Sequence, residues 1–175
     1  MALDRWIVRA GSGSIHAGLL RAGSAEFQVS MGRSGIGTTK QEGDGVTPAG
    51  SFPLRRLLWR ADRLPRPVTC LPCTPILPRD GWCDAALDAR YNRPVMLPYP
   101  ASAEALWRPD GVYDLVLVIG HNDNPVIPGA GSAVFFHLCR ADRGPTAGCL
   151  AASLSDLLQL VGMATPATVL EIQAG

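Results

Sequence analysis

The chain has 175 residues, which is the length of one domain, and 47% of them are apolar, so it can bury a sizeable core. Its 16 basic and 15 acidic residues nearly cancel, which argues against the basic footprint of a nucleic-acid-binding protein. The 19 glycines and 15 prolines favour turns and short strands over a helix bundle.

The first nine residues lack the apolar run and the small-residue cleavage site of a secretory signal. The longest apolar run, Leu115 to Ile119, is too short to span a bilayer. Five cysteines are an odd number, so at least one thiol is free or pairs between chains, which points to a reducing compartment. The residues alone therefore favour a cytoplasmic protein without a membrane span.

The N-terminal half of the chain predicts three strands separated by turns. Loose alternation of apolar residues indicates strands at 5–9 and 26–30, and the second is closed by the Gly-rich stretch 32–37. Residues 42–50 are dense with turn formers. A strand at 51–58 follows, and the proline near its start suits an edge or a strand entry.

A Pro-rich, irregular segment occupies residues 61–100, and residues 103–107 follow it as a short helical turn. A segment of this length without periodicity is long for a structureless loop, and such insertions are often functional.

The second half of the chain carries the best strand signals. The apolar run at 113–119 predicts one strand and residues 132–138 predict the next. Alternation in the second strand places its side chains on two faces. One face has Val134, Phe136 and Leu138, and the other has Ala133, Phe135 and His137.

One helix is predicted late in the chain. Ser153 and Asp156 fit a capping box that opens a helix through about Met163. Residues 168–173 then form a last strand. The predicted buried face of the helix consists of Leu154, Leu157, Leu158 and Val161. We therefore expect a mainly β fold with a small helical element, in a single domain covering residues 1–175.

The strand that carries His137 is followed by a polar loop and then by Ala147, Gly148 and Cys149, an order that suits thiol catalysis. A thiol is a poor nucleophile until it loses its proton, and a nearby imidazole can lower its pKa and take that proton. Taken singly, Cys149 is more simply a buried small hydrophobe and His137 a core histidine. The two together favour a nucleophile and its base.

Two motifs in the same order resemble those of the L,D-transpeptidases of the YkuD type. Thr146-Ala-Gly-Cys149 downstream of His137 is similar to their cysteine signature. The segment from Gly43 to Phe52 is similar to their Gly-x-Thr-Pro-x-Gly-x-Phe segment. The Gly-rich stretch 32–37 and the strand ending at His137 also fit, so that the resemblance runs from about residue 26 to 173, to a short branch of the family.

The resemblance implies a YkuD-like β-sandwich and an acyl transfer on peptidoglycan stem peptides. The family attacks the amide after the diamino acid of a stem tetrapeptide, releases D-alanine and holds the rest as a thioester. An amine from a second stem then forms a crosslink, whereas water would give an L,D-carboxypeptidase or amidase. Such a substrate lies in the cell envelope or periplasm. No cofactor, metal or nucleic acid is implied.

Carried onto this sequence, the resemblance makes Cys149 the nucleophile and His137 the base. The N–H groups of Gly148 and Cys149 would bind the oxyanion, and Thr146 would lie beside the thiol. The sequence departs from the family at Leu138, where glycine or serine is usual, and this leaves the group that orients His137 unassigned. A backbone carbonyl can serve.

The second departure is Ala151, where many members carry arginine. Further candidates for substrate binding are His121, after the strong strand, and Arg140 and Arg143 in the loop before Cys149, with Arg33 a weaker one. The arginines could pair with a carboxylate. The alternatives are a surface turn for His121 and solvated loop arginines.

Cys70, Cys73 and Cys83 hint at a zinc site, but no nearby histidine completes four ligands. A disulfide or free thiols are the favoured reading, and we expect no metal. The alternative to an enzyme is a non-catalytic module that binds the cell wall or is stabilised by zinc.

Overall fold

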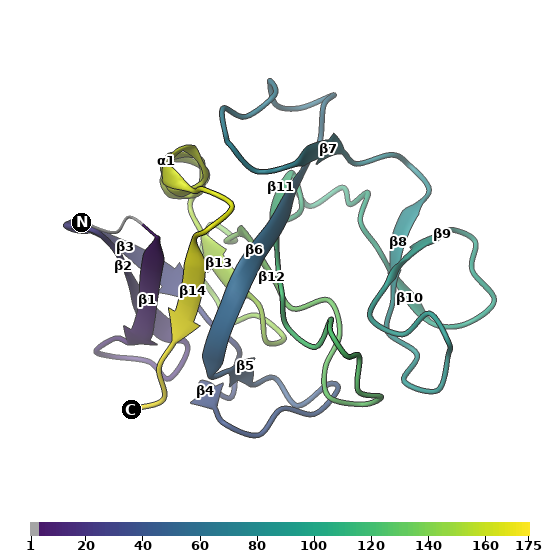
Figure 1. Ribbon diagram of the computed structural model, residues 1–175, viewed down its shortest axis with the longest axis horizontal. Coiled ribbons are helices and arrows are strands. Elements are labelled where there is room, and N and C mark those ends of the chain that lie inside the picture. The colour runs from purple at the N-terminus through teal and green to yellow at the C-terminus, as the bar shows by residue number, and fades with distance from the viewer. Residues whose placement is uncertain (1–3) are drawn as a thin grey trace.

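The computed structural model describes residues 4–175 and is built around one nine-stranded sheet (Figure 1). Its strand order is β11-β12-β13-β3-β2-β1-β14-β6-β7. The bounds of these strands are β1 Arg5–Ala10, β2 Ala17–Ala22, β3 Ala25–Ser30, β6 Gly50–Trp59, β7 Cys73–Pro75, β11 Leu115–Ile119, β12 Phe135–Leu138, β13 Leu150–Ala152 and β14 Val169–Ile172.

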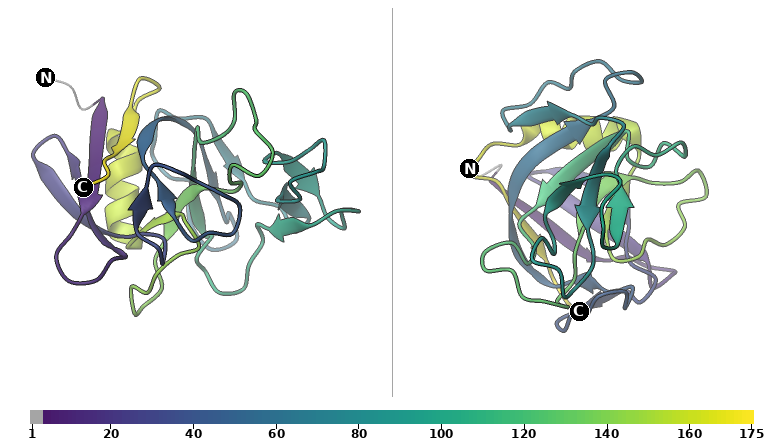
Figure 2. Two further views of the ribbon diagram at one scale, coloured as in Figure 1. Left: turned by 90° about the horizontal axis from the view of Figure 1, so that it is seen from below. Right: turned by 90° about the vertical axis from the view of Figure 1, so that its right-hand side faces the viewer.

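The sheet closes on itself because β11 pairs with β12 on one side and with β6 on the other. Figure 2 shows the strands curving round in its right-hand view. Strand β7 extends the sheet beyond β6. The prediction of a mainly β, YkuD-like fold with one helical element is confirmed.

Two apolar clusters lie on opposite faces of β12. The larger cluster contains Val134 and Phe136 together with residues of β1, β2, β3, β6, β11, β13, β14 and the helix. The smaller cluster contains Ala133 and Phe135 together with Cys149. The two-face prediction for residues 132–138 is confirmed, and it puts His137 on the side of the smaller cluster.

The Pro-rich segment is less irregular than the sequence predicts. Together with residues 103–105 it forms a three-stranded sheet of order β10-β8-β9, made of β8 Asp80–Cys83, β9 Pro94–Met96 and β10 Ala103–Ala105. This sheet lies at the far side of the molecule from β1 and α1 (Figure 1). The prediction of a helical turn at 103–107 is wrong, because β10 pairs with β8. A short pair, β4 Ile36–Gly37 and β5 Thr47–Pro48, joins the two glycine-rich segments.

Helix α1, Leu154–Met163, begins as the capping box predicts, since the backbone N–H of Asp156 donates to the Ser153 hydroxyl at 3.1 Å. Its buried residues are Leu157, Leu160 and Val161. Leu154 and Leu158, which were predicted to be buried, are more than a third exposed. The buried face of the helix therefore includes Leu160 in place of these two residues. Within residues 4–175 no helix has the length and apolar character needed to cross a membrane.

Strands β2 and β13 of the main sheet are among those with no counterpart in the sequence prediction. Strand β2 buries Gly18, Leu20 and Ala22 in strict alternation and joins β3 through a turn at Gly23, whose φ of 61° suits glycine. Strand β13 follows Cys149 directly and runs parallel to β12. That parallel pair positions the candidate site.

Candidate active site

The parallel pairing of β12 with β13 brings the segment of Cys149 back to the strand of His137. In the register of the two strands His137 lies opposite Ala151, and Phe136 lies opposite Leu150. Cys149 therefore sits at the start of β13, one residue before the paired region. The intervening loop, 139–149, carries the polar residues of the sequence motif.

The sulfur of Cys149 is held by backbone groups of the neighbouring strand. The N–H of Phe135 donates to Sγ at 3.2 Å, and the thiol donates to the carbonyl oxygen of Ala133 at 3.2 Å. Ala133 adopts a left-handed backbone with a φ of 48°, and the side-chain oxygen of Asn92 accepts its N–H at 3.1 Å. The thiol is thus placed by a locally strained backbone that Asn92 supports.

The imidazole of His137 is oriented by the carbonyl oxygen of Leu138, 2.9 Å from Nδ1. A carbonyl only accepts, so Nδ1 carries the proton and Nε2 keeps a lone pair for an incoming proton. The departure from the family at position 138 therefore leaves the orienting group intact, because the backbone supplies it. The ring is 8% exposed and packs edge-on against Tyr113, with centroids 5.1 Å apart.

Burial keeps both groups neutral in the free protein. It lowers the pKa of His137 to about 4, with the nearby charges of Arg108 and Arg140 acting in the same direction. Burial also raises the pKa of the Cys149 thiol to about 12. The expectation that His137 lowers the thiol pKa is wrong for the resting site, which holds a neutral thiol and a neutral imidazole.

The threonine of the Gly-x-Thr-Pro segment supports the backbone next to the cysteine. Thr47, which is fully buried, donates its hydroxyl to the carbonyl oxygen of Gly148 at 3.0 Å and accepts the N–H of Gly32 at 2.8 Å. Gly148 has a φ of 139°, and a Cβ there would lie 2.8 Å from the carbonyl oxygen of Val46. The two glycine-rich segments and the turn before Cys149 are therefore joined through Thr47.

Thr146 closes the turn before the cysteine. Its hydroxyl donates to the carbonyl oxygen of Cys149 at 2.6 Å and accepts the N–H of Gly148 at 3.1 Å. Its own N–H donates to the carbonyl oxygen of Met31, and the N–H of Arg33 donates back to its carbonyl. The Gly148 donor that the resemblance assigns to an oxyanion is thus engaged by Thr146 in this structure.

A cavity of about 630 Å³ brings most of the predicted residues together. Cys149, His137, Gly148, Thr146 and Arg140 all line it, and so does Arg33. Arg143 does not line it; this side chain reaches the carbonyl oxygen of Gln28 instead.

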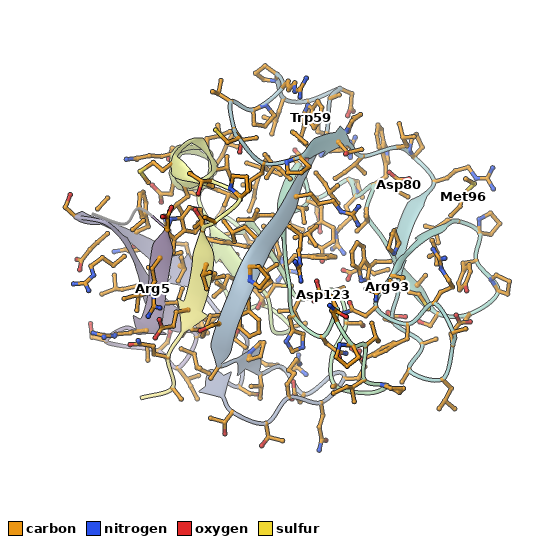
Figure 3. All side chains as sticks on the ribbon, in the orientation of Figure 1. Arg5, Trp59, Asp80, Arg93, Met96 and Asp123 are labelled. Carbon is orange, nitrogen blue, oxygen red and sulfur yellow. The ribbon has the colours of Figure 1, made fainter. Side chains whose placement is uncertain are left out.

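His121 lies elsewhere. It lines a second cavity of about 370 Å³ together with Arg55, Arg93 and Asp123. Arg93 and Asp123 are labelled near the centre of Figure 3, between β6 and the three-stranded sheet. His121 Nε2 is 2.9 Å from the carbonyl oxygen of Ala130, and burial lowers its pKa.

Several other residues that line this cavity were not predicted as site residues from the sequence. Among them are Lys40, Glu104, Arg108 and Tyr113. Lys40 is nearly buried and forms an ion pair with Asp44. Glu104 comes from β10, where the sequence predicts a helical turn instead of a strand, so no local pattern links it to Cys149. Tyr113 was visible only as the first residue of a predicted strand.

The cysteines of the Pro-rich segment do not converge. All five cysteines of the chain are free thiols, with Cys70 exposed and Cys83 buried. Across residues 4–175 no group of three histidine, cysteine or acidic side chains is arranged to hold a metal ion.

Comparison with known proteins gave one match. Residues 18–172 match the model of the YkuD family, described as the L,D-transpeptidase catalytic domain. The matched range includes both motifs and every residue that lines the larger cavity. Searches of the curated proteins and of the solved structures found no match.

Proposed function

Since this chain belongs to the YkuD family of L,D-transpeptidase catalytic domains, we propose that residues 1–175 are a single peptidoglycan acyltransferase domain with Cys149 as nucleophile and His137 as general base. The family implies a peptidoglycan substrate and is typically associated with the cell wall. We place this protein's action in the cell envelope or periplasm on that basis. The observation that carries the chemical proposal is the shared cavity, which receives both side chains.

Acylation starts from two neutral partners. Once the thiol turns from the carbonyl oxygen of Ala133, Nε2 of His137 accepts its proton as Sγ attacks the carbonyl carbon of the stem-peptide amide. The carbonyl π electrons move to oxygen, and backbone N–H groups at Gly148 and Cys149 stabilise the resulting oxyanion once the Gly148 donor exchanges Thr146 for the substrate. The imidazolium then returns the proton to the departing amine of D-alanine, and the C–N bond breaks to leave a thioester.

Deacylation reuses the same base. An amine acceptor attacks the thioester carbon, gives its proton to His137 and forms the new amide, while the thiolate leaves and is reprotonated. Water as acceptor would make a carboxylate and the outcome an L,D-carboxypeptidase.

Cationic side chains suit the carboxylates of such a peptide. Arg33, Lys40 and Arg140 line the cavity, and Arg140 is exposed and free to meet a ligand. Arginine binds carboxylate through paired N–H donors, so we assign Arg140 to substrate binding. His121 lines the second cavity, together with Arg55 and Asp123. We therefore propose that His121 contacts only a longer ligand, one that reaches from the first cavity into the second.

The test is incubation with a stem tetrapeptide and an amine acceptor, with products separated by mass. A crosslinked product supports transpeptidation, whereas tripeptide and D-alanine without a crosslink make the protein a carboxypeptidase acting through the same thioester. The matched control is Cys149→Ala, which should give neither. Absence of both products with the native chain would leave a non-catalytic wall-binding module and overturn the proposal.

A further inference from the structure

We propose that Glu104 is a positioning residue of this site, which holds Tyr113 against His137 and whose negative charge opposes the ionisation of Cys149 in the free enzyme. The inference rests on the proposed function insofar as Cys149 is the nucleophile. It gives the three-stranded sheet of the Pro-rich segment a role, because Glu104 lies on β10 of that sheet.

The positioning contact runs through one phenol. The hydroxyl of Tyr113 donates to Oε1 of Glu104 at 2.7 Å. The Tyr113 ring is buried and packs edge-on against His137, at 5.1 Å between centroids, and against Phe135, at 6.0 Å. A buried ring whose only polar atom has a fixed partner keeps one orientation. Glu104 therefore fixes the wall against which the imidazole rests.

The second contribution is electrostatic, and charged groups of both signs face the sulfur. Burial is the main reason that the Cys149 thiol has a raised pKa, and the N–H of Phe135 acts against it. Glu104 then raises this pKa and Lys40 lowers it. Of the other titratable groups, His137 is neutral and the pKa of Tyr113 is well above its ordinary value, so neither is charged near neutral pH.

Glu104 itself is only partly compensated. Arg108 lies 3.5 Å from Oε1, but this guanidinium also binds Asp110 at 2.6 Å. Asp84 and Glu42, which line the same cavity, add like charge, and the pKa of Glu104 is raised chiefly by burial. Among residues 4–175 the hydrogen bonds to the Glu104 carboxylate all fall on Oε1. Its carboxylate charge is thus left to act across the cavity on the sulfur.

The test compares alkylation of Cys149 by iodoacetamide in the native chain and in Glu104→Gln, between about pH 6 and 10. Glutamine keeps an oxygen acceptor for Tyr113 and removes the charge. Because the thiolate is the reacting form, alkylation of Glu104→Gln should be about three- to tenfold faster at alkaline pH. Glu26→Gln, an exposed position on β3, removes the same charge away from the cavity and should match the native chain.

Superimposable pH profiles for Glu104→Gln and the native chain would overturn the electrostatic role. The positioning role is read from Glu104→Ala, which also removes the acceptor and should lower kcat for the tetrapeptide more than Glu104→Gln does. Equal kcat for the two variants would overturn it. Alkylation of Cys149 does not require turnover of the tetrapeptide, so the two proposals can fail separately. If the native chain leaves the tetrapeptide intact while Glu104→Gln still speeds alkylation, the proposed function is refuted and the charge effect of Glu104 stands.

Discussion

Thr47 donates its hydroxyl to the carbonyl oxygen of Gly148 at 3.0 Å across 101 residues of sequence. The same hydroxyl accepts the N–H of Gly32 at 2.8 Å, so one buried side chain joins the two glycine-rich turns to the residue before Cys149. The threonine of the Gly-x-Thr-Pro segment therefore has a structural reason to accompany the cysteine motif: it fixes the backbone that presents the sulfur.

Replacing Thr47 by valine should destabilise the chain and the site together. The change leaves a buried N–H and a buried carbonyl without partners, at a cost of about 2–4 kcal/mol in the free energy of unfolding. Denaturant unfolding followed by circular dichroism measures this. Thr39→Val, at an exposed position, is the matched control and should change stability by less than about 0.5 kcal/mol. Equal stability of the two variants would contradict the role of Thr47.

Gly148→Ala should be far more damaging than Gly129→Ala. Both glycines have positive φ, 139° and 77°, but only at Gly148 would a Cβ meet a backbone atom, at 2.8 Å from the carbonyl oxygen of Val46. We expect about 1 kcal/mol of destabilisation at Gly129 from the backbone conformation alone, and at least about 3 kcal/mol at Gly148. Thermal unfolding of both variants measures the two losses, and the larger loss at Gly148 combines backbone strain at a φ of 139° with the collision. Similar losses would mean that the Gly148 backbone relaxes freely.

The pH dependence of kcat/KM should have an unusually low acid limb. The base must be unprotonated, and burial lowers the pKa of His137 to about 4, so protonation removes activity only as pH falls through that value. Between this limb and the thiol pKa of about 12, the profile should be flat. Circular dichroism at each pH checks that the chain stays folded. An acid limb near the ordinary histidine value of 6.5 would show that the imidazole is more hydrated than the structure has it.

Thiol labelling of the resting protein should favour Cys70 over Cys149. Cys70 is exposed, whereas Cys149 is buried with a raised pKa, so iodoacetamide at neutral pH should modify Cys70 first. Peptide mapping after short exposures gives the order. Faster modification of Cys149 would indicate a preformed thiolate and contradict the raised pKa of this thiol.

Local patterns were sufficient for much of the fold. Alternation placed Phe135 and Phe136 on opposite faces of β12, and Ser153 marked the start of α1, because both features depend on neighbours within four residues. Strand β2 was within reach of the same reasoning, since Gly18, Leu20 and Ala22 alternate, but glycine and alanine weaken the apolar signal.

The rest depends on contacts that no local pattern records. The order of the motifs predicted His137 and Cys149 as site residues. Lys40 and Glu104 reach the same cavity from distant segments, so no motif identified them. Glu104 was hidden because β10 is only three residues long and pairs with β8 about twenty positions earlier. The pKa shifts of His137 and Cys149 could not be predicted from the sequence for a similar reason. Burial is the main cause of both shifts, and burial is a property of the packed chain.

The most direct test is intact mass after incubation with a carbapenem, a class of acylating ligand with which members of the resembled family form thioesters. We predict one covalent adduct per chain, mapped by peptide fragmentation to Cys149, greatly slowed in His137→Gln and absent in Cys149→Ala. An unmodified native chain, or an adduct on Cys70, Cys73, Cys83 or Cys139, would contradict the assignment of Cys149 as the nucleophile.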